Sequence, residues 1–457
     1  MARKRRQIPD DLLVVRVAGS DRRGRGWAVA GDRRVFLPCA LPGELVEFRY
    51  ARRARRADEG RVERILEAAP ERVSPRCPNF AHCGGCRDQH IAHSVQLQRA
   101  TAALQDALAA GGVRVGRLEA PLRGPLWRYR RRARLAVRHV PKKGAVLAGF
   151  REKAANLVAD MWRCEVMAPP VAENLVALRL LLGELEARQR IPQVEVACGD
   201  DEGAMVFRYL ERLGSGDRAR LAAFEAESGI GVFLQPGGLE TVHRLVERPA
   251  GRAARHPREG SEQGGRLCYR LPAQGTALWF EPTDFIQVNG YVNRHLVDLA
   301  MSWLEARSGQ RVLDLFCGIG NFTLPIAQTG AATLGVEGDA RLVGRARENA
   351  ARNGLSGVRF EVQDLFGEPG AGAALQWRPA KILLDPPRSG ASELCRALVE
   401  GPSVSVERIV YVSCSLASFA ADAAALVRGG YRLEKLRVVD MFPHTGHIET
   451  AACFEPR

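Results

Sequence analysis

The chain has 457 residues, of which 46% are hydrophobic, so it is long enough for several domains with cores of their own. That apolar content excludes a disordered chain. No apolar run reaches the length of a membrane span and the first residues lack the apolar stretch of a signal peptide, so we expect no membrane association and a cytoplasmic location. In that compartment the 11 cysteines are expected to be buried thiols, metal ligands or nucleophiles rather than disulfides.

The positive charge of the chain, +15 in total, is concentrated in two segments. Residues 1–66 carry 17 basic and 9 acidic side chains, and residues 121–153 carry 11 basic side chains and one acidic one. Because these segments have net charges of +8 and +10, the remaining residues sum to −3. A genome-wide preference for Arg would affect the whole chain, so the pattern favours a polyanion such as nucleic acid as the partner.

Short alternating strands are expected over residues 8–66, at 12–17, 27–30, 34–38, 44–48 and 61–66. About five strands separated by Gly and Pro are typical of a small β-barrel of the OB type, a common nucleic-acid platform. The next expected elements are a helix over 94–110, strands over 134–137 and 145–150, and one amphipathic helix over 171–189. Residues 248–266 lack periodicity and are expected to form a loop insertion. From about residue 290, apolar strands alternate with helical segments, which predicts a parallel α/β sheet.

One strand of that predicted sheet ends in a glycine-rich turn. Residues 311–316 indicate a buried strand, and Gly318 and Gly320 then lead into a helix. Glycines at such a turn let the backbone approach a ligand that lies over the carboxyl end of the strand. Leu324 replaces the third glycine of the dinucleotide-binding pattern, which disfavours a nicotinamide cofactor.

Acidic residues follow the next three strands. Glu337, Asp364 and Asp385 each lie at a predicted strand end. Because parallel strands end at the same edge of a sheet, we expect these acids to line one edge, with Glu337 placed to accept ribose hydroxyls. Asp385 is followed by two prolines, a motif typical of base methyltransferases, so S-adenosylmethionine is the better fit among nucleoside cofactors.

Cys414 follows a further buried strand and is expected at the same edge. A buried structural thiol is the alternative reading of a single strand cysteine. Methylation of uracil would give this thiol a role: C5 of uracil is a poor nucleophile until a thiolate adds to C6, and a base must then remove the C5 proton. The C-terminal tail supplies a carboxylate in Glu449.

Five strings in this order resemble the RNA uracil-C5 methyltransferases that use S-adenosylmethionine: Phe285–Asn289, Leu313–Thr323, Asp385–Arg388, Tyr411–Cys414 and His444–Glu449. The resemblance implies Cys414 as the nucleophile and Glu449 as the proton acceptor. It also implies cofactor contacts from Gln287, Phe316, Asn321, Glu337, Asp364 and Asp385. The family usually continues Ser-Cys-Asn-Pro, whereas Ser415 and Leu416 follow the cysteine here.

Cys77, Cys83 and Cys86 lie close together in the sequence, and Cys164 follows at a distance. Thiolate ligands suit zinc or an iron–sulfur cluster, and the spacing alone hardly separates the two. Within the family that the chain resembles, the members that act on 23S ribosomal RNA carry four such cysteines and an N-terminal barrel called a TRAM domain. The resemblance therefore implies a [4Fe-4S] cluster on Cys77, Cys83, Cys86 and Cys164, and 23S rRNA as the partner.

The expected fold class is α/β, with a Rossmann-like S-adenosylmethionine methyltransferase domain over residues 276–457. An OB-like (TRAM) barrel is expected over 8–66 and a central α+β iron–sulfur domain over 70–275, in a monomeric chain.

Two alternative functions remain: a catalytically weak RNA-binding or ribosome-assembly factor, and uridine-C5 methylation of another RNA such as tRNA. A cytosine-C5 enzyme is disfavoured because Pro387 precedes Arg388 where the RNA enzymes of that kind generally carry Pro-Cys. The cysteine spacing also differs from that of radical methylases.

Overall fold

The structure is a computed structural model that describes residues 11–21, 24–53, 57–153, 156–245, 266–367, 370–400 and 406–457. The loop insertion predicted at 248–266 lies outside these residues, apart from Arg266. The chain divides into two compact units. Unit 1 comprises residues 1–99, 151–156 and 444–446, and unit 2 comprises residues 100–150, 157–443 and 447–457.

Unit 1 is built on a six-stranded sheet with the strand order β1-β5-β6-β4-β3-β2. Its strands are β1 (Leu13–Arg16), β2 (Gly19–Ser20), β3 (Gly26–Ala30), β4 (Arg33–Leu37), β5 (Leu45–Arg52) and β6 (Asp58–Glu67). Alternate residues such as Val35, Leu37, Val46 and Phe48 are buried together, which explains the alternation seen in the sequence. Gly60 lies so close to Phe48 that a Cβ would approach its ring to 2.5 Å. The predicted strands are thus confirmed, while closure into a TRAM barrel stays a prediction.

Unit 2 contains a second six-stranded sheet with the order β13-β12-β11-β10-β8-β9. Its strands are β8 (Arg132–Val140), β9 (Ala145–Gly149), β10 (Gln193–Cys198), β11 (Gly203–Arg208), β12 (Gly231–Gln235) and β13 (His243–Arg244). Helices α2 (Pro169–Ala172), α3 (Leu175–Glu184) and α4 (Ser215–Ser228) pack against it. The strands predicted at 134–137 and 145–150 are therefore confirmed, as part of β8 and as β9.

The prediction of one amphipathic helix over 171–189 is wrong. Two helices, α2 and α3, occupy this segment, and the backbone between them leaves helical geometry at Asn174, with φ −102° and ψ 7°. The Asn174 side-chain amide donates a hydrogen bond to the carbonyl oxygen of Pro170 at 2.8 Å. A short polar side chain that bonds its own backbone competes with helix formation, which explains the break. The second helix ends before Leu185, whose backbone is extended.

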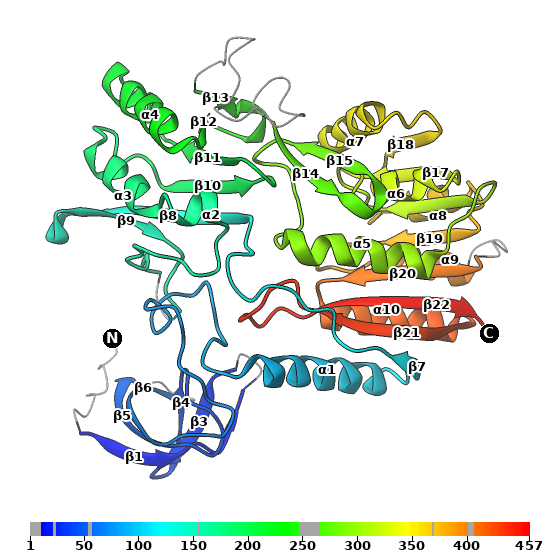
Figure 1. The fold of residues 1–457 in the computed structure, drawn as a ribbon. Coiled ribbons are helices and arrows are strands. Elements are labelled where there is room, and N and C mark those ends of the chain that lie inside the picture. Colours follow the sequence, from blue (N-terminus) through cyan, green and yellow to red (C-terminus); the bar gives the residue numbers. More distant parts are fainter. Residues whose placement is uncertain are drawn as a thin grey trace, which may run out of the picture. The chain divides into compact units, whose positions relative to one another are not determined.

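The largest sheet of unit 2 has eight strands in the order β18-β17-β16-β19-β20-β22-β21-β7 (Figure 1). They are β7 (Val115–Leu118), β16 (Arg311–Leu315), β17 (Ala332–Glu337), β18 (Val358–Val362), β19 (Lys381–Leu384), β20 (Arg408–Ser413), β21 (Tyr431–Val439) and β22 (Glu449–Pro456). Strands β16 to β20 are mutually parallel, which confirms the predicted parallel sheet, and β22 is antiparallel to β20. Strand order reverses between β16 and β19, the place where open α/β sheets bind ligands.

Helices cover both faces of this sheet. They are α1 (His93–Ala110), α5 (Gly290–Leu304), α6 (Thr323–Gln328), α7 (Ala340–Arg352), α8 (Gly370–Leu375), α9 (Ser392–Glu400) and α10 (Leu416–Arg428). Val312 and Val410 pack with α5, α6 and α7, whereas their neighbours Leu313 and Tyr411 pack with α8, α9 and α10. Because strand residues are buried on both faces, these strands form nearly continuous apolar runs in the sequence. Among the helices that the structure describes, none combines the length and apolarity needed to span a bilayer.

Candidate active site and cysteine loop

The parallel strands of the eight-stranded sheet end in a row of acidic residues. Glu337 is the last residue of β17, Asp364 follows β18, and Asp385 follows β19. Since these strands pair side by side around β16, the acids lie along the carboxyl edge of the sheet. The predicted placement of the three acids is confirmed.

The turn after β16 runs along this edge. Gly318 and Gly320 have φ of 54° and 96°, and Phe316, which is not a glycine, has φ of 63°. Left-handed backbone at such a residue is uncommon and concentrates at binding sites. The N–H of Gly318 donates to the Glu337 carboxylate at 3.1 Å, and so does the N–H of Asp339. The hydrogen bond from Gly318 thus holds the glycine-rich turn against Glu337, the first of the predicted cofactor acids.

Asn321 is fixed by its neighbours in the same turn. Its Oδ1 accepts hydrogen bonds from the Tyr269 hydroxyl and from Asn293 Nδ2, both at 2.9 Å. Its Nδ2 donates to Asn293 Oδ1 at 3.1 Å. An amide nitrogen has two hydrogens, so one remains for a ligand. Tyr269 and Asn293 were not identified from the sequence, because they lie 52 and 28 residues from Asn321.

Gln287 reaches the acidic row from the loop that precedes α5. Its Nε2 donates to Asp385 Oδ2 at 3.1 Å. Burial raises the pKa of Asp385 to about 7, and the hydrogen bond from Gln287 opposes that rise. The structure therefore places two predicted cofactor residues, one from a loop and one from a strand end, in direct contact.

Asp314 on β16 is a further acid of this region that sequence reasoning missed. Its side chain is fully buried, and Oδ2 accepts a hydrogen bond from the Thr323 hydroxyl at 2.5 Å. Burial raises the pKa of Asp314 to about 8; the Thr323 hydroxyl lowers it, and the charges of Asp385 and Glu337 raise it. The sequence feature that could have identified Asp314 is an acidic residue between apolar neighbours inside a predicted buried strand.

Cys414 and Glu449, the two predicted catalytic residues, lie at the same edge. Strand β20 pairs with β22 so that Ser413 is opposite Thr450, and Cys414 and Glu449 are the residues that adjoin this pair. The Glu449 carboxyl is buried, and its Oε2 has no hydrogen-bond partner in the part of the chain that the structure describes. Burial, and secondarily the charge of Asp385, raises its pKa well above the usual range.

The Cys414 thiol is half-buried and surrounded by charge. Burial raises its pKa, the charges of Glu449 and Asp385 raise it further, and the charge of Arg388 lowers it. Arg388 Nη2 donates to His447 Nδ1 at 3.0 Å. Sequence reasoning missed both Arg388 and His447 as site residues, although both lie within strings that carry the family resemblance.

The departure at Ser415 and Leu416 leads directly into α10. Leu416 is the first residue of that helix and Ser415 precedes it with extended backbone. Farther along α10, Asp422 accepts hydrogen bonds from the Tyr411 hydroxyl at 2.6 Å and from the N–H of Ala391 at 2.8 Å. The strand that leads to Cys414 and the loop after Asp385 are therefore both hydrogen-bonded to one buried carboxylate.

The cysteines at 77, 83 and 86 lie in a loop of unit 1. Cys83 and Cys86 are buried, and the N–H of Gly85 donates to Cys83 Sγ at 3.4 Å. Burial raises the pKa of Cys83 to about 11, the Gly85 N–H lowers it, and the neighbouring thiols of Cys86 and Cys77 raise it. Cys164 is buried in unit 2. Within the described ranges, no group of three or more Cys, His, Asp or Glu side chains has an arrangement ready to hold a metal ion.

The basic run at 121–153 is only partly a charged surface. Five of its cations pair with acids of unit 2: Arg128 with Glu173, Arg131 with Asp200, Arg132 and Arg134 with Glu195, and Lys143 with Asp160. Arg131, one of the cations of the segment expected to meet a polyanion, is instead buried, with its guanidinium 4.8 Å from the centre of the Tyr269 ring. Arg123, Arg138 and Lys142 are exposed.

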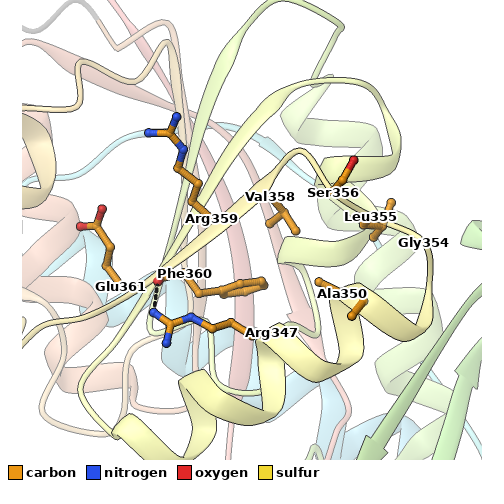
Figure 2. A pocket seen from close by; sticks show the side chains of 10 residues that line it. Arg347, Ala350, Gly354, Leu355, Ser356, Val358, Arg359, Phe360 and Glu361 are labelled. Atoms are coloured by element: carbon orange, nitrogen blue, oxygen red, sulfur yellow. Dashed lines mark hydrogen bonds between the residues drawn. The ribbon is translucent and has the colours of Figure 1, made fainter.

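A hollow of about 680 Å³ lies elsewhere, where the end of α7 meets β18 (Figure 2). It is lined by Ala350, Val358 and Phe360, among others, and Arg347 donates to the carbonyl oxygen of Phe360 at 2.6 Å. None of its lining residues belongs to the acidic row or to the pair formed by Cys414 and Glu449. The hollow is therefore separate from the candidate active site.

Comparison with known proteins gives two family matches. Residues 306–372 match the model of a methyltransferase domain, and residues 373–457 match the model described as tRNA (Uracil-5-)-methyltransferase. The chain is 46% identical to the 23S rRNA (uracil(1939)-C(5))-methyltransferase RlmD of Alkalilimnicola ehrlichii, over 100% of this chain and 99% of that one. It is 41% identical to the protein of the same description from Alcanivorax borkumensis, again over 100% and 99%.

Among solved structures, the chain resembles the Pyrococcus abyssi tRNA (uracil-54, C5)-methyltransferase in complex with S-adenosyl-L-homocysteine. The TM-score is 0.69 at 22% identity, with 96% of this chain and 99% of that chain covered. At this identity the likeness establishes a shared fold, and it extends over nearly the whole chain.

Proposed function

This chain belongs to the family of RNA uracil-C5 methyltransferases, and we propose that within the family it methylates C5 of a uridine in 23S rRNA with S-adenosylmethionine as the methyl donor. Its curated relatives are named for uracil 1939, and we propose the equivalent uridine as the target. The observation that carries the proposal is the buried Glu449 carboxyl close to the Cys414 thiol, at the sheet edge that also holds Asp385.

Cys414 acts as the nucleophile. Its thiolate adds to C6 of the uracil ring, and the electron pair of the C5–C6 double bond moves into an enolate whose C5 is nucleophilic. S-adenosylmethionine, when bound, supplies a methyl group on an electron-poor sulfur. Arg388 favours the thiolate because its positive charge lowers the pKa of Cys414.

Glu449 acts as the base. After methylation C5 carries both a methyl group and a proton, and the Glu449 carboxylate accepts that proton. The electrons of the C5–H bond restore the C5–C6 double bond, and the C6–S bond breaks to return Cys414. A raised pKa suits this step because it makes the carboxylate a stronger base.

The cofactor is held by the row at the carboxyl edge of the sheet: Gln287, Phe316, Asn321, Glu337, Asp364 and Asp385. Glu337 supplies carboxylate oxygens for the ribose hydroxyls, which donate hydrogen bonds. The remaining hydrogen of Asn321 Nδ2 and the ring of Phe316 complete the contacts. Support comes from the geometry of the strand ends and from the direct contact of Gln287 with Asp385.

A 5-fluorouridine substrate tests the function. An rRNA fragment with 5-fluorouridine at the target position should form a complex that survives denaturation, because fluorine at C5 cannot be removed as a proton. Peptide mapping should place the RNA on Cys414. Normal turnover of unmodified RNA without any stable complex on the fluorinated RNA would overturn the covalent mechanism.

We also propose that Cys77, Cys83, Cys86 and Cys164 hold a [4Fe-4S] cluster with a structural role. The donor types fit, since such clusters are held by four thiolates. The contact of the Gly85 N–H with Cys83 Sγ supports the proposal, because hydrogen bonds to sulfur stabilise thiolate charge. No step of the methyl transfer requires the cluster.

Metal analysis tests the cluster. Protein purified without oxygen should be brown and contain about four iron and about four sulfide per chain. Replacing Cys86 with Ser should remove the colour, while replacing Cys268, a half-buried thiol on β14 (Leu267–Leu271), should leave it intact. Zinc in place of iron in the anaerobic protein would refute the cluster.

The six-stranded sheet of unit 1 is proposed to be a TRAM barrel that binds rRNA. Support comes from the net charge of +8 over residues 1–66 and from the small size of the sheet. Ultraviolet crosslinking of the intact enzyme to its RNA fragment should yield peptides from β3 to β5. Crosslinks confined to unit 2 would refute the role.

A further inference from the structure

The loop from Glu281 to Asn289 joins strand β15 (Thr276–Phe280) to α5 and carries Gln287. Near its beginning lies Asp284, whose side chain is fully buried. Nothing in the methyl-transfer chemistry uses Asp284. Its surroundings nevertheless link it to both sides of the cofactor edge.

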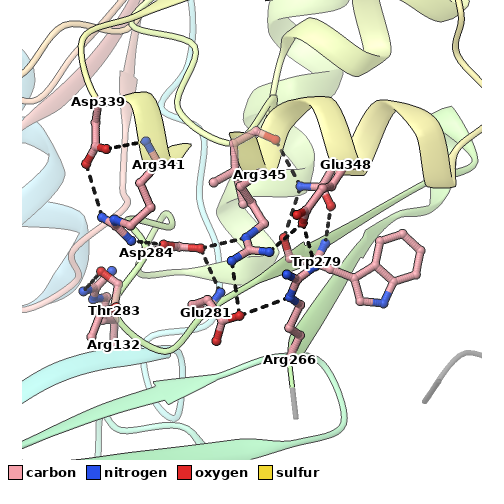
Figure 3. A network of polar contacts seen from close by, with 12 residues as sticks. Arg132, Arg266, Trp279, Glu281, Thr283, Asp284, Asp339, Arg341, Arg345 and Glu348 are labelled. Atoms are coloured by element: carbon pink, nitrogen blue, oxygen red, sulfur yellow. Dashed lines mark hydrogen bonds and ion pairs between the residues drawn. The ribbon is translucent and has the colours of Figure 1, made fainter. Parts of the chain in front are cut away.

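Asp284 is the centre of a polar network (Figure 3). Its Oδ1 accepts a hydrogen bond from Arg341, and its Oδ2 accepts from Arg345 Nε at 3.3 Å and from the N–H of Glu281 at 2.8 Å. Both arginines belong to α7, the helix that follows Glu337. A buried carboxylate with two guanidinium partners and a backbone donor holds the loop firmly against α7.

The network continues to Glu337. Arg341 also pairs with Asp339 at 3.2 Å, and the Asp339 side chain caps α7 by accepting from the N–H of Arg341 at 2.8 Å. The N–H of Asp339 in turn donates to Glu337 Oε1 at 3.1 Å. Because Gln287 contacts Asp385, the loop and α7 together connect Glu337 with Asp385.

The other side of the loop is attached to the start of the basic strand β8 and to Arg131, the residue before it. Arg132 Nη2 donates to the carbonyl oxygen of Thr283 at 2.9 Å, and the N–H of Arg131 donates to the carbonyl oxygen of Val288 at 2.8 Å. Arg132 is thus engaged with the loop that positions Gln287. The loop is held between the basic segment and the cofactor edge.

We propose that Asp284, through Arg341, is a positioning residue that fixes this loop so that Gln287 and Glu337 are preorganised for the nucleoside cofactor. The inference rests on the proposed function, because it assigns the cofactor to that edge. Loosening the loop raises the entropic cost of ordering Gln287 and Glu337 on binding, so cofactor affinity falls while the nucleophile stays in place.

Binding of S-adenosylhomocysteine to the full chain, measured by titration calorimetry, tests the proposal. Asp284→Asn keeps the volume but removes the charge, and it should weaken binding by roughly tenfold, within the range found for coupling networks. The Michaelis constant for S-adenosylmethionine should rise, whereas kcat at saturating cofactor and RNA affinity should change little. Arg341→Gln, on the helix side, should reproduce the effect.

Two controls separate positioning from general stability. Asp217→Asn alters another buried carboxylate, which accepts two backbone N–H groups at 2.8 and 2.9 Å, and it should lower the melting temperature without changing cofactor affinity. The double variant of Asp284 and Arg341 should bind about as weakly as either single variant. If Asp284→Asn fails to fold, Arg341→Gln alone decides.

The outcomes are distinguishable. Unchanged affinity in folded Asp284→Asn or Arg341→Gln would overturn the positioning role, as would a loss in Asp217→Asn equal to theirs. Absence of S-adenosylhomocysteine binding in the unaltered chain would instead overturn the proposed function. Additive losses in the double variant would show that the two residues act separately and would also refute the proposal.

Discussion

Glu449 and Cys414 adjoin each other at one sheet edge, where burial raises the pKa of the Cys414 thiol and the negative charge of the Glu449 carboxylate raises it further. The same burial raises the pKa of Glu449 well above its usual range. Both side chains must lose a proton to work, Cys414 to attack C6 and Glu449 to accept the C5 proton. The relationship therefore determines how the reaction depends on pH.

Single-turnover methylation is expected to accelerate as pH rises from about 6 to about 9, since the thiolate fraction of Cys414 grows throughout that range. Arg388→Gln should move the profile to higher pH, because the Arg388 charge lowers the pKa of Cys414. Rapid-quench measurements with labelled cofactor supply the rates. A rate independent of pH would argue against the thiolate as the attacking group.

Replacement of Cys414 by Ala is expected to abolish methyl transfer while leaving RNA affinity within about twofold, since affinity comes from basic side chains. Gel-shift titration and methyl incorporation measure the two properties in the same preparation. Cys268→Ala removes a half-buried thiol on β14 and should keep full activity. Turnover near that of the unaltered enzyme in Cys414→Ala would exclude it as the nucleophile.

Replacement of Glu449 by Gln is expected to slow turnover by about 10²- to 10⁴-fold, the usual range for loss of a catalytic base. The adduct should still form, so a denaturant-resistant complex with ordinary uridine RNA should accumulate on gels. Gln also relieves the thiol of a neighbouring negative charge, which favours adduct formation. If neither turnover nor adduct level changes, another residue is the base.

Much of the active site could be predicted because parallel strands end at one edge. The positions of Glu337, Asp364 and Asp385 followed from that rule alone. Cys414, which directly follows the parallel strand β20, was placed by the same rule. Glu449 begins the antiparallel strand β22, so the rule does not cover it, and the family resemblance supplied its role. Local patterns therefore sufficed wherever a residue lies at the end of its own strand.

Long-range polar contacts could not be predicted in the same way. Asp284 and Arg341 are 57 residues apart, and nothing in either local sequence identifies the other as its partner. The same limit applies to Arg131, which belongs to the segment predicted to meet a polyanion but is buried near Asp200, 69 residues away. The net charge of a segment follows from its composition alone. Whether one of its basic side chains is buried depends on which acids the fold places near it.

Asp314 makes the stability of the chain depend on pH. The pKa of this residue is 3.8 ordinarily and about 8 in the folded chain, so between these values the folded chain holds a proton that the unfolded chain has lost. The free energy of unfolding should therefore fall as pH rises through that window, by up to about 1.4 kcal/mol per pH unit.

Asp314→Asn tests this dependence. Asn keeps an acceptor for the Thr323 hydroxyl and cannot ionise, so the variant should be less sensitive to pH and more stable than the unaltered chain near pH 8. Urea unfolding at a series of pH values, followed by tryptophan fluorescence, compares the two chains. Parallel curves for both would show that Asp314 does not carry the effect.

The exposed cations of β8 should differ in their contribution to RNA binding. Arg138 makes no ion pair with the described residues, whereas Arg134, on the same strand, pairs with Glu195 at 2.9 Å. A phosphate bound by Arg138 releases its counterions, but one bound by Arg134 must compete with Glu195 for the guanidinium.

Arg138→Ala should therefore lower the slope of log affinity against log salt by about 0.7, the value for one single-strand phosphate. Arg134→Ala should change the slope less, and fluorescence anisotropy over a salt series measures both. Equal effects of the two variants would mean that RNA displaces Glu195, and no effect of either would place the RNA on another surface.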